Sequence, residues 1–294
     1  MRIHSRPNSR LVVHAPAKVN LFLEVLGKRS DGYHELETLM VAVNLYDTLV
    51  FQEEDSGAIE FRCEDAAIPQ GPTNLVVRSA LLLRHETQSQ GRGVRIWLRK
   101  RIPVAAGLGG GSSDAAASLM ALNEIWKLGL SLPAVESLGA RIGSDVPFFF
   151  HTPAAVGRGR GELIQPLKLP RPIHLVIVCP EEGVSTADVY RSLALGPSTA
   201  RRSITPAMSA LATGDLEGLS RNLFNRLEAT ACAICPAIAE AHRAIQATGL
   251  AGPLVTGSGS ASFGLARDRR AAVEAARTIR ERFPGRVLVT RSTP

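Results

Sequence analysis

The stretch at residues 102–117 reads IPVAAGLGGGSSDAAA and predicts a loop that delivers the chain into a helix. Glycines and small hydroxyl residues gather at its centre, and an alanine-rich segment of high helix propensity follows. Ser112 or Ser113 is the expected N-cap, and Asp114 is expected in the first turn, where the helix dipole favours a negative side chain. We expect this helix to run to about Lys127.

A helix start of this kind is a potential phosphate site. The first N–H groups of a helix have no partner within it, and glycines let the loop backbone come close to a ligand. A tight turn with a good cap is the plainer interpretation of a Gly-Gly-Ser run. The stretch also matches neither Gly-x-x-x-x-Gly-Lys-Ser/Thr nor Gly-x-Gly-x-x-Gly. The length of the whole string favours the phosphate site.

The length and composition of the chain predict two domains. Its 294 residues are 45% hydrophobic, which is enough for buried cores. No apolar run approaches the ~20 residues that a bilayer-spanning helix needs, so we expect no membrane association and a cytoplasmic location. The glycine-rich segment 157–162 is flexible in character, and we place the boundary shortly after it, which gives domains 1–165 and 166–294.

The net charge of +7 raises the possibility of a nucleic-acid partner. Lysines and arginines are nevertheless spread along the chain, without a dense block or interleaved aromatic residues that could stack bases. A positive field that attracts phosphorylated small molecules explains the charge equally well. We therefore expect a small-molecule partner and no nucleic acid, with an RNA-binding module as the alternative of a different class.

The four cysteines are too few and too scattered for a disulfide framework. Cys232 and Cys235 have the spacing of a metal or redox pair, but no second pair matches them. We expect buried, reduced thiols.

Two polar residues share one face of a predicted strand near the N-terminus. Residues 11–25 read as two β segments joined at 15–17. In the second segment Lys18 and Asn20 are two residues apart, so their side chains project to the same face.

Asp145 lies in a predicted turn. A short helix at about 133–142 ends at Gly-Ser-Asp-Val-Pro, and 148–150, three consecutive phenylalanines, read as a buried strand. A carboxylate beside an apolar strand is costly unless something needs it. The alternative is an aspartate that caps its own turn.

Several segments, taken in order, resemble the kinases named for galactose, homoserine, mevalonate and phosphomevalonate, the GHMP kinases. They are residues 16–21 (PAKVNL), 31–34 (DGYH), the glycine stretch 103–116, 143–147 (GSDVP), 183–186 (GVST) and 256–260 (TGSGS). The resemblance implies a mixed α/β (α+β) architecture of two domains. The N-terminal domain would be similar to ribosomal protein S5 domain 2, and the C-terminal domain would be ferredoxin-like.

The resemblance implies that ATP is bound along the glycine stretch. The residues concerned are Pro103, Val104, Ala105, Ala106, Gly107, Leu108, Gly109, Gly110, Gly111, Ser112 and Ser113, together with Asn74. Mg²⁺ is expected with ATP. No carboxylate cluster identifies its ligands, so they stay unassigned and the phosphates are expected to hold it.

By the same resemblance, Asp145 takes the proton of the acceptor hydroxyl and Lys18 keeps this carboxylate ionised. Phosphoryl transfer relies mainly on positioning and on neutralising the phosphate oxygens, which suits this pair. An ordinary exposed strand lysine is the alternative for Lys18.

The segment 31–34 is similar to the branch of the family that phosphorylates a cytidine-diphosphate-linked alcohol on the way to isoprenoid precursors. Tyr33 would lie against the cytosine ring and His34 would bind its edge, with Asn20, Thr186 and Tyr190 completing the substrate site. A half-buried loop tyrosine is the alternative for Tyr33. A kinase of mevalonate, phosphomevalonate or homoserine is the alternative function.

Two segments depart from the family pattern. A proline or threonine is usual where Ser260 and Ala261 stand, and the segment 157–161 carries an additional Arg-Gly unit. The oligomeric state is left open by the sequence.

Overall fold

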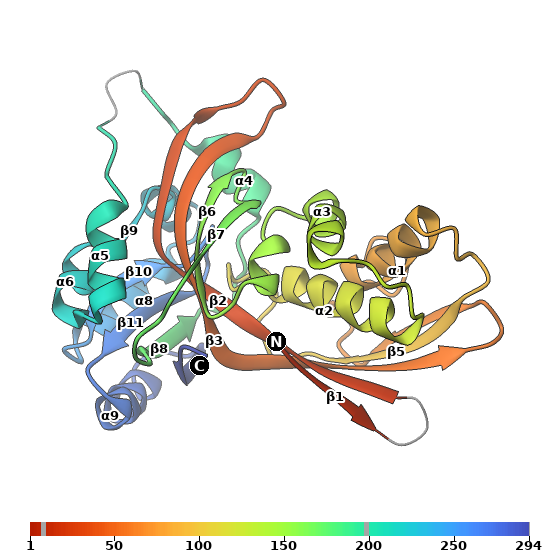
Figure 1. Ribbon diagram of the computed structural model, residues 1–294. Coiled ribbons are helices and arrows are strands. Elements are labelled where there is room, and N and C mark those ends of the chain that lie inside the picture. The colour runs from red at the N-terminus through yellow and green to blue at the C-terminus, as the bar shows by residue number, and fades with distance from the viewer. Residues whose placement is uncertain (7–9, 197–199, 294) are drawn as a thin grey trace. The chain divides into compact units, whose positions relative to one another are not determined.

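The computed structural model describes residues 1–6, 10–196 and 200–293. The chain forms two compact units, each built from separate stretches of sequence (Figure 1). The first unit comprises 1–17, 45–102 and 109–151, and the second comprises 18–44, 103–108 and 152–294. The predicted boundary at residue 165 divides the chain only once and stays a prediction.

The first unit is a sheet with helices on one face (Figure 1). Its strands, in sheet order, are β1 (Arg2–Arg6), the beginning of β2 (Arg10–Lys28), the end of β3 (His34–Glu54), β5 (Gly93–Arg99) and β4 (Ile59–Cys63). β1 and β2 are antiparallel, as are β3 and β5, whereas β4 and β5 are parallel.

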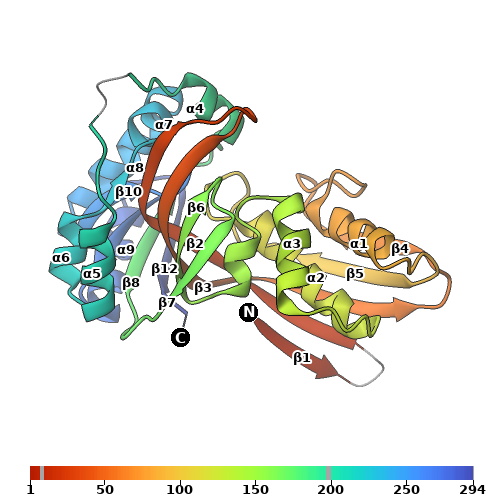
Figure 2. The same ribbon diagram turned by 45° about the horizontal axis from the view of Figure 1, so that its top comes forward.

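Three helices cover this sheet (Figure 2). They are α1 (Leu75–Glu86), α2 (Gly110–Ile125) and α3 (Leu132–Ile142), and the 3-10 helix η1 (Pro147–Phe150) follows α3. Trp126, at the end of α2, is fully buried and donates a hydrogen bond to the Gly93 carbonyl at 3.2 Å. This contact ties the end of α2 to the beginning of β5.

The second unit contains a further part of the first sheet and a sheet of its own. The remainder of β2 pairs in parallel with β9 (Phe224–Asn225), and β3 pairs with β6 (Ala154–Gly159), which pairs with β7 (Leu163–Leu167). The separate antiparallel sheet has the order β10 (Ala251–Val255), β11 (Ser262–Ala266), β8 (His174–Cys179), β12 (Arg286–Arg291).

Helices α8 (Ala237–Gln246) and α9 (Arg269–Arg280) pack on one face of this four-stranded sheet (Figure 2). Val176 and Val178 of β8 both join the cluster with Ala241 and Ile245 of α8, because residues two apart in a strand share a face. The unit also contains α4 (Thr186–Ser192), α5 (Thr205–Thr213), α6 (Leu216–Arg221) and α7 (Glu228–Ile234).

Two local predictions are wrong. The strand predicted in two parts around residues 15–17 is one strand, β2, because Ala15 and Ala17 are small and Pro16 fits an extended backbone. Residues 148–150 form the 3-10 helix η1, not a strand. The Phe149 and His151 N–H groups bond to carbonyls three residues back, which a proline at the start of the turn permits.

Candidate active site

The glycine stretch delivers the chain into α2 three or four residues earlier than predicted. Gly109 is the N-cap, with a left-handed φ of 70°, and the helix begins at Gly110. The predicted cap at Ser112 or Ser113 is therefore wrong, because a glycine can adopt this conformation without the steric cost of a side chain. Ser113 is the first residue whose N–H bonds back within the turn, to the Gly109 carbonyl at 2.9 Å.

This start of α2 fits a phosphate. The N–H groups of Gly110, Gly111 and Ser112 precede the first bond of the helix, and no side chain caps them. Gly111 is exposed and Ser112 is partly exposed. Ser113 is fully buried, and its Oγ has no hydrogen-bond partner among the described residues. An anion at this helix start would therefore contact Ser112 and the free N–H groups rather than the buried Ser113 side chain.

The preceding residues, 103–108, form a loop that belongs to the second unit. Lys18 donates its backbone N–H to Leu108 at 2.9 Å, and Ala261 donates to Ala106 at 3.2 Å. Val184 donates to Ala105 at 3.4 Å. The structure thus brings together three of the separate segments that carry the family resemblance, and Ala261 directly follows a fourth, 256–260.

We expect Gly107→Ala to destabilise the protein by at least about 2 kcal/mol. Gly107 has a φ of 74°, and a Cβ there would lie 2.1 Å from the Thr256 carbonyl oxygen. Thermal unfolding checks this, with Gly27→Ala as the control because a Cβ at Gly27 meets nothing within 4 Å. Equal melting temperatures for the two variants would contradict the close approach of the loops.

Lys18 and Asn20 face the same way on β2, as predicted, and both are buried. The Lys18 Nζ donates to the Asn20 Oδ1 at 2.5 Å. Asn20 also donates from its side chain to the Thr38 Oγ1 at 2.8 Å and from its backbone to the Thr256 Oγ1 at 2.9 Å. A Cβ on Gly257 would lie 3.1 Å from the Lys18 Nζ, so this glycine leaves room for the ammonium group.

Asp145 lies in the first unit, in the turn between α3 and η1. It is partly exposed, unlike Lys18. A Cβ on Gly143 of the same turn would lie 3.9 Å from the Ser112 Oγ. The turn that carries Asp145 is therefore beside the start of α2.

The residues predicted to bind the substrate gather in the second unit. The rings of His34 and Tyr190 stack with their centroids 5.0 Å apart. Tyr33 is 53% exposed, and the Arg160 guanidinium lies 4.7 Å from its ring centroid. The pKa of His34 is lowered, first by burial and then by the charge of Lys28, which favours a neutral imidazole.

Thr186 belongs to the same helix as Tyr190, α4, and exchanges a hydrogen bond with Ser258 at 2.7 Å. Ser258 lies in the third glycine segment, residues 256–260, two residues after the Thr256 that bonds to Asn20. Thr186 is thus connected through residues 256–258 to Asn20, which accepts a hydrogen bond from the Lys18 Nζ.

Asn74 caps α1, and the structure does not place it in a ligand site. Its side-chain oxygen accepts from the Val76 N–H at 2.8 Å, and its amide nitrogen donates to the Pro69 carbonyl at 2.8 Å. These bonds explain the residue structurally, so its predicted contact with ATP stays a prediction.

Thr38 and Asn225 support the candidate site through hydrogen bonds, although the sequence did not single them out. Asn225 is buried, and its side-chain amide donates to the carbonyls of Val255 and Gly257 at 2.8 and 2.7 Å. These bonds hold the beginning of the third glycine segment, the segment in which Ser260 departs from the family pattern.

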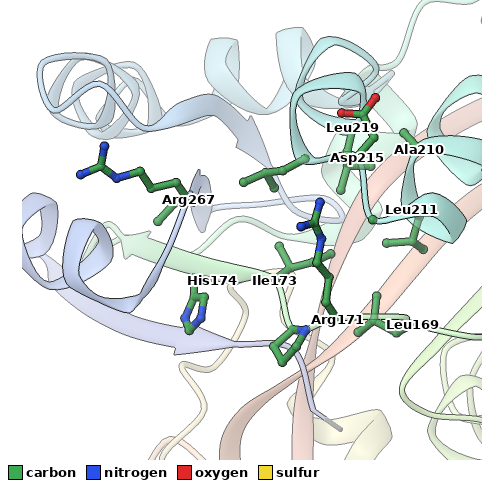
Figure 3. Close-up of a pocket in the computed structure, with 13 residues that line it drawn as sticks. Leu169, Arg171, Ile173, His174, Ala210, Leu211, Asp215, Leu219 and Arg267 are labelled. Atoms are coloured by element: carbon green, nitrogen blue, oxygen red, sulfur yellow. The ribbon is translucent and has the colours of Figure 1, made fainter.

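A pocket lies elsewhere in the second unit, at the ends of β8 and β11 beside α5 and α6 (Figure 3). Arg171, His174, Asp215 and Arg267 contribute its polar side chains. None of the predicted site residues lines it, so it is not the predicted ATP or substrate site.

The described residues contain no cluster of three or more His, Cys, Asp or Glu side chains that could hold a metal ion. All four cysteines are free thiols, of which Cys179 and Cys235 are buried and Cys63 and Cys232 partly so. Within the same described ranges, no helix is both long and apolar enough to cross a bilayer.

Family models match both parts of the chain. The model of the GHMP kinases N terminal domain matches residues 74–152, and that of the GHMP kinases C terminal matches residues 207–285. A protein of Pelotomaculum thermopropionicum named 4-diphosphocytidyl-2-C-methyl-D-erythritol kinase is 43% identical over 278 residues, which cover 95% of this chain and 96% of that protein. The chain belongs to the GHMP kinase family.

Solved structures agree with the GHMP kinase assignment. A 4-(cytidine 5'-diphospho)-2C-methyl-D-erythritol kinase superposes with a TM-score of 0.80 at 40% identity, over 96% of this chain and all of that one. Homoserine kinase from Cytophaga hutchinsonii has a TM-score of 0.75 at 20% identity, covering 99% of this chain and 96% of its own, and shows a shared fold only. The predicted mixed α/β GHMP kinase fold is confirmed.

Proposed function

We propose that this GHMP kinase transfers the γ-phosphoryl group of ATP to the 2-hydroxyl of 4-diphosphocytidyl-2-C-methyl-D-erythritol, in the non-mevalonate (methylerythritol phosphate) pathway to isoprenoid precursors. The observation that carries the proposal is the 43% identity, over nearly the whole chain, to a protein named as that kinase. The stacked rings of His34 and Tyr190 support it, because aromatic side chains suit a pyrimidine ring.

In the proposed reaction the acceptor oxygen attacks the γ-phosphorus while the bond from this phosphorus to the bridging oxygen breaks and ADP leaves. Asp145 accepts the hydroxyl proton, and Lys18 supplies a positive charge that keeps the base ionised and steadies the acceptor oxygen. The buried position of Lys18, with Asn20 holding its Nζ, supports a fixed direction for this charge.

The phosphates of ATP are proposed to bind at the start of α2. The free N–H groups of Gly110, Gly111 and Ser112 provide donors, and the helix dipole favours negative charge there. When bound, Mg²⁺ would neutralise charge on the phosphate oxygens. Loop 103–108 and Asn74 complete the proposed ATP site.

The acceptor decides between this function and its alternatives, so the test compares acceptors. The purified protein is incubated with ATP and Mg²⁺ and with the cytidine-diphosphate substrate, mevalonate, phosphomevalonate or homoserine, each at the same concentration. We expect ADP release only with the cytidine-diphosphate substrate. Tyr33→Ala should raise the KM for this substrate by about tenfold, with little change in the KM for ATP. Leu163→Ala, another exposed hydrophobic residue, is the control.

Turnover of mevalonate or homoserine without turnover of the cytidine substrate would replace the proposed acceptor. Tight RNA binding with a steep salt dependence, and no shift in melting temperature with ATP or a cytidine ligand, would support the RNA-binding alternative instead. The free thiols fit action in the cytoplasm, which is where we propose that the enzyme works.

A further inference from the structure

Three ionisable side chains form a buried cluster beneath the start of α2. The Lys100 Nζ contacts a carboxylate oxygen of Asp47 and lies 2.9 Å from the Asp114 Oδ2. The side chains are 7%, 0% and 3% exposed for Lys100, Asp47 and Asp114. All three belong to the first unit, and neither the sequence prediction nor the proposed chemistry gives the cluster a role.

The cluster connects the two ends of the glycine stretch. The Asp47 Oδ1 accepts the backbone N–H groups of Arg101 and Ile102 at 2.6 and 2.9 Å, where the chain leaves β5. Asp114 lies on α2, one turn beyond the helix start. Lys100 bonds to both carboxylates, so it joins the residues before the stretch to the helix that begins within it.

Lys100 also lies directly against the helix start. A Cβ on Gly110 would lie 3.1 Å from the Lys100 Nζ. The ammonium is therefore next to the first residue of α2, the position that we propose for the phosphates. Glycine at position 110 permits this approach.

The charge balance of the cluster fits this location. Burial, with a smaller contribution from Asp47, raises the pKa of Asp114 to about 8 even though Lys100 opposes the shift. Burial therefore favours the uncharged form of Asp114, which reduces the negative charge beneath the proposed anion site. This explains how two buried carboxylates can lie close to a site for phosphate.

We propose that Asp47, Lys100 and Asp114 are positioning residues that clamp the two ends of the glycine stretch and thereby set the geometry of the start of α2 for ATP. The inference rests on the proposed ATP site. It predicts that breaking the clamp weakens ATP binding and loosens this segment while the remainder of the first unit stays folded.

The test measures ATP affinity by calorimetry and amide hydrogen exchange over residues 101–114. Lys100→Met alone leaves Asp47 buried without its cation and can prevent folding. The charge-balanced double variant Lys100→Met with Asp47→Asn avoids this problem, and the introduced amide keeps an oxygen for the Arg101 and Ile102 N–H groups. We expect its dissociation constant for ATP to rise by about tenfold and exchange in 101–114 to accelerate.

Arg95→Met is the matched control. Arg95 lies on the same strand, β5, and pairs with Glu54 and Glu60, but it does not reach the glycine stretch. It should change neither ATP affinity nor exchange in 101–114. Asp114→Leu should weaken ATP binding, and Asp114→Asn should restore most of the loss because an amide oxygen can still accept from Lys100.

If the folded double variant binds ATP like Arg95→Met and exchange in 101–114 is unchanged, the clamp is refuted. If instead the wild-type protein itself does not bind ATP, the proposed function fails. In that case, accelerated exchange in the double variant would still show that the cluster of Asp47, Lys100 and Asp114 holds residues 101–114. The two failures are therefore distinguishable.

Discussion

Asp145→Asn is expected to lower kcat by about 10²–10⁴-fold with the cytidine-diphosphate substrate, while the dissociation constant for ATP changes by less than about threefold. An amide cannot accept the hydroxyl proton, but it occupies the same space and keeps hydrogen-bonding capacity in the turn between α3 and η1. The effect should therefore fall on the chemical step. Initial rates at saturating substrates, with calorimetry for ATP, measure the two quantities separately.

Asp65→Asn is a suitable control for this variant. Asp65 is an exposed turn residue of the same unit, where its Oδ1 accepts the Ala67 N–H at 3.0 Å. It should leave kcat unchanged. Lys18→Met should also lower kcat strongly, and the double variant with Asp145→Asn should lose little more than either single variant if the two residues act as one unit. Full turnover by Asp145→Asn would remove this residue from the mechanism.

The sequence was sufficient to locate the glycine stretch and the face shared by Lys18 and Asn20. Both follow from local rules, the helix propensity after a glycine run in one case and the two-residue period of a strand in the other. The start of α2 was misplaced because Gly109 adopts the left-handed conformation that composition alone does not specify.

The partners of these residues could not be predicted because they come from distant parts of the chain. Thr256 bonds to Asn20 across 236 positions, and only the folded β2 and the third glycine segment bring them together. Asp114 shows the same limit. The sequence predicted Asp114 in the first turn of the helix, where its charge would interact favourably with the helix dipole. This prediction is wrong, because α2 begins earlier and Asp114 is buried in the core beside Lys100. Tertiary burial overrode the local preference.

Arg226→Met is expected to lower the free energy of unfolding by about 3–5 kcal/mol. Its partner, Glu24 on β2, has a fully buried side chain. The Arg226 Nε and Nη2 donate to the two carboxylate oxygens of Glu24 at 2.7 and 2.8 Å. Removing the guanidinium leaves a buried charge that the Val25 and Arg202 N–H groups alone must satisfy. Urea unfolding at pH 7 measures the loss.

The loss of stability in Arg226→Met is expected to depend on pH. Burial alone would raise the pKa of Glu24, but the hydrogen bonds from Arg226 and from the Arg202 and Val25 backbones outweigh it, so the pKa is lowered. The wild-type pair therefore contributes stability above the unfolded-state pKa and loses it as pH falls through the folded-state value. In Arg226→Met, burial dominates and the pKa of Glu24 rises, so protonation relieves the unpaired charge. The deficit relative to wild type should shrink between pH 7 and pH 5.

The pair is distinguished from an ordinary surface contact by two further variants. Arg221→Met removes an exposed arginine that pairs with Glu217 on α6, and it should change the free energy of unfolding by less than about 0.5 kcal/mol. Glu24→Met combined with Arg226→Met removes both charges and should recover most of the stability that Arg226→Met loses, because no buried charge is left uncompensated. A double variant as unstable as Arg226→Met would mean that the arginine stabilises the protein through its packing rather than by compensating Glu24.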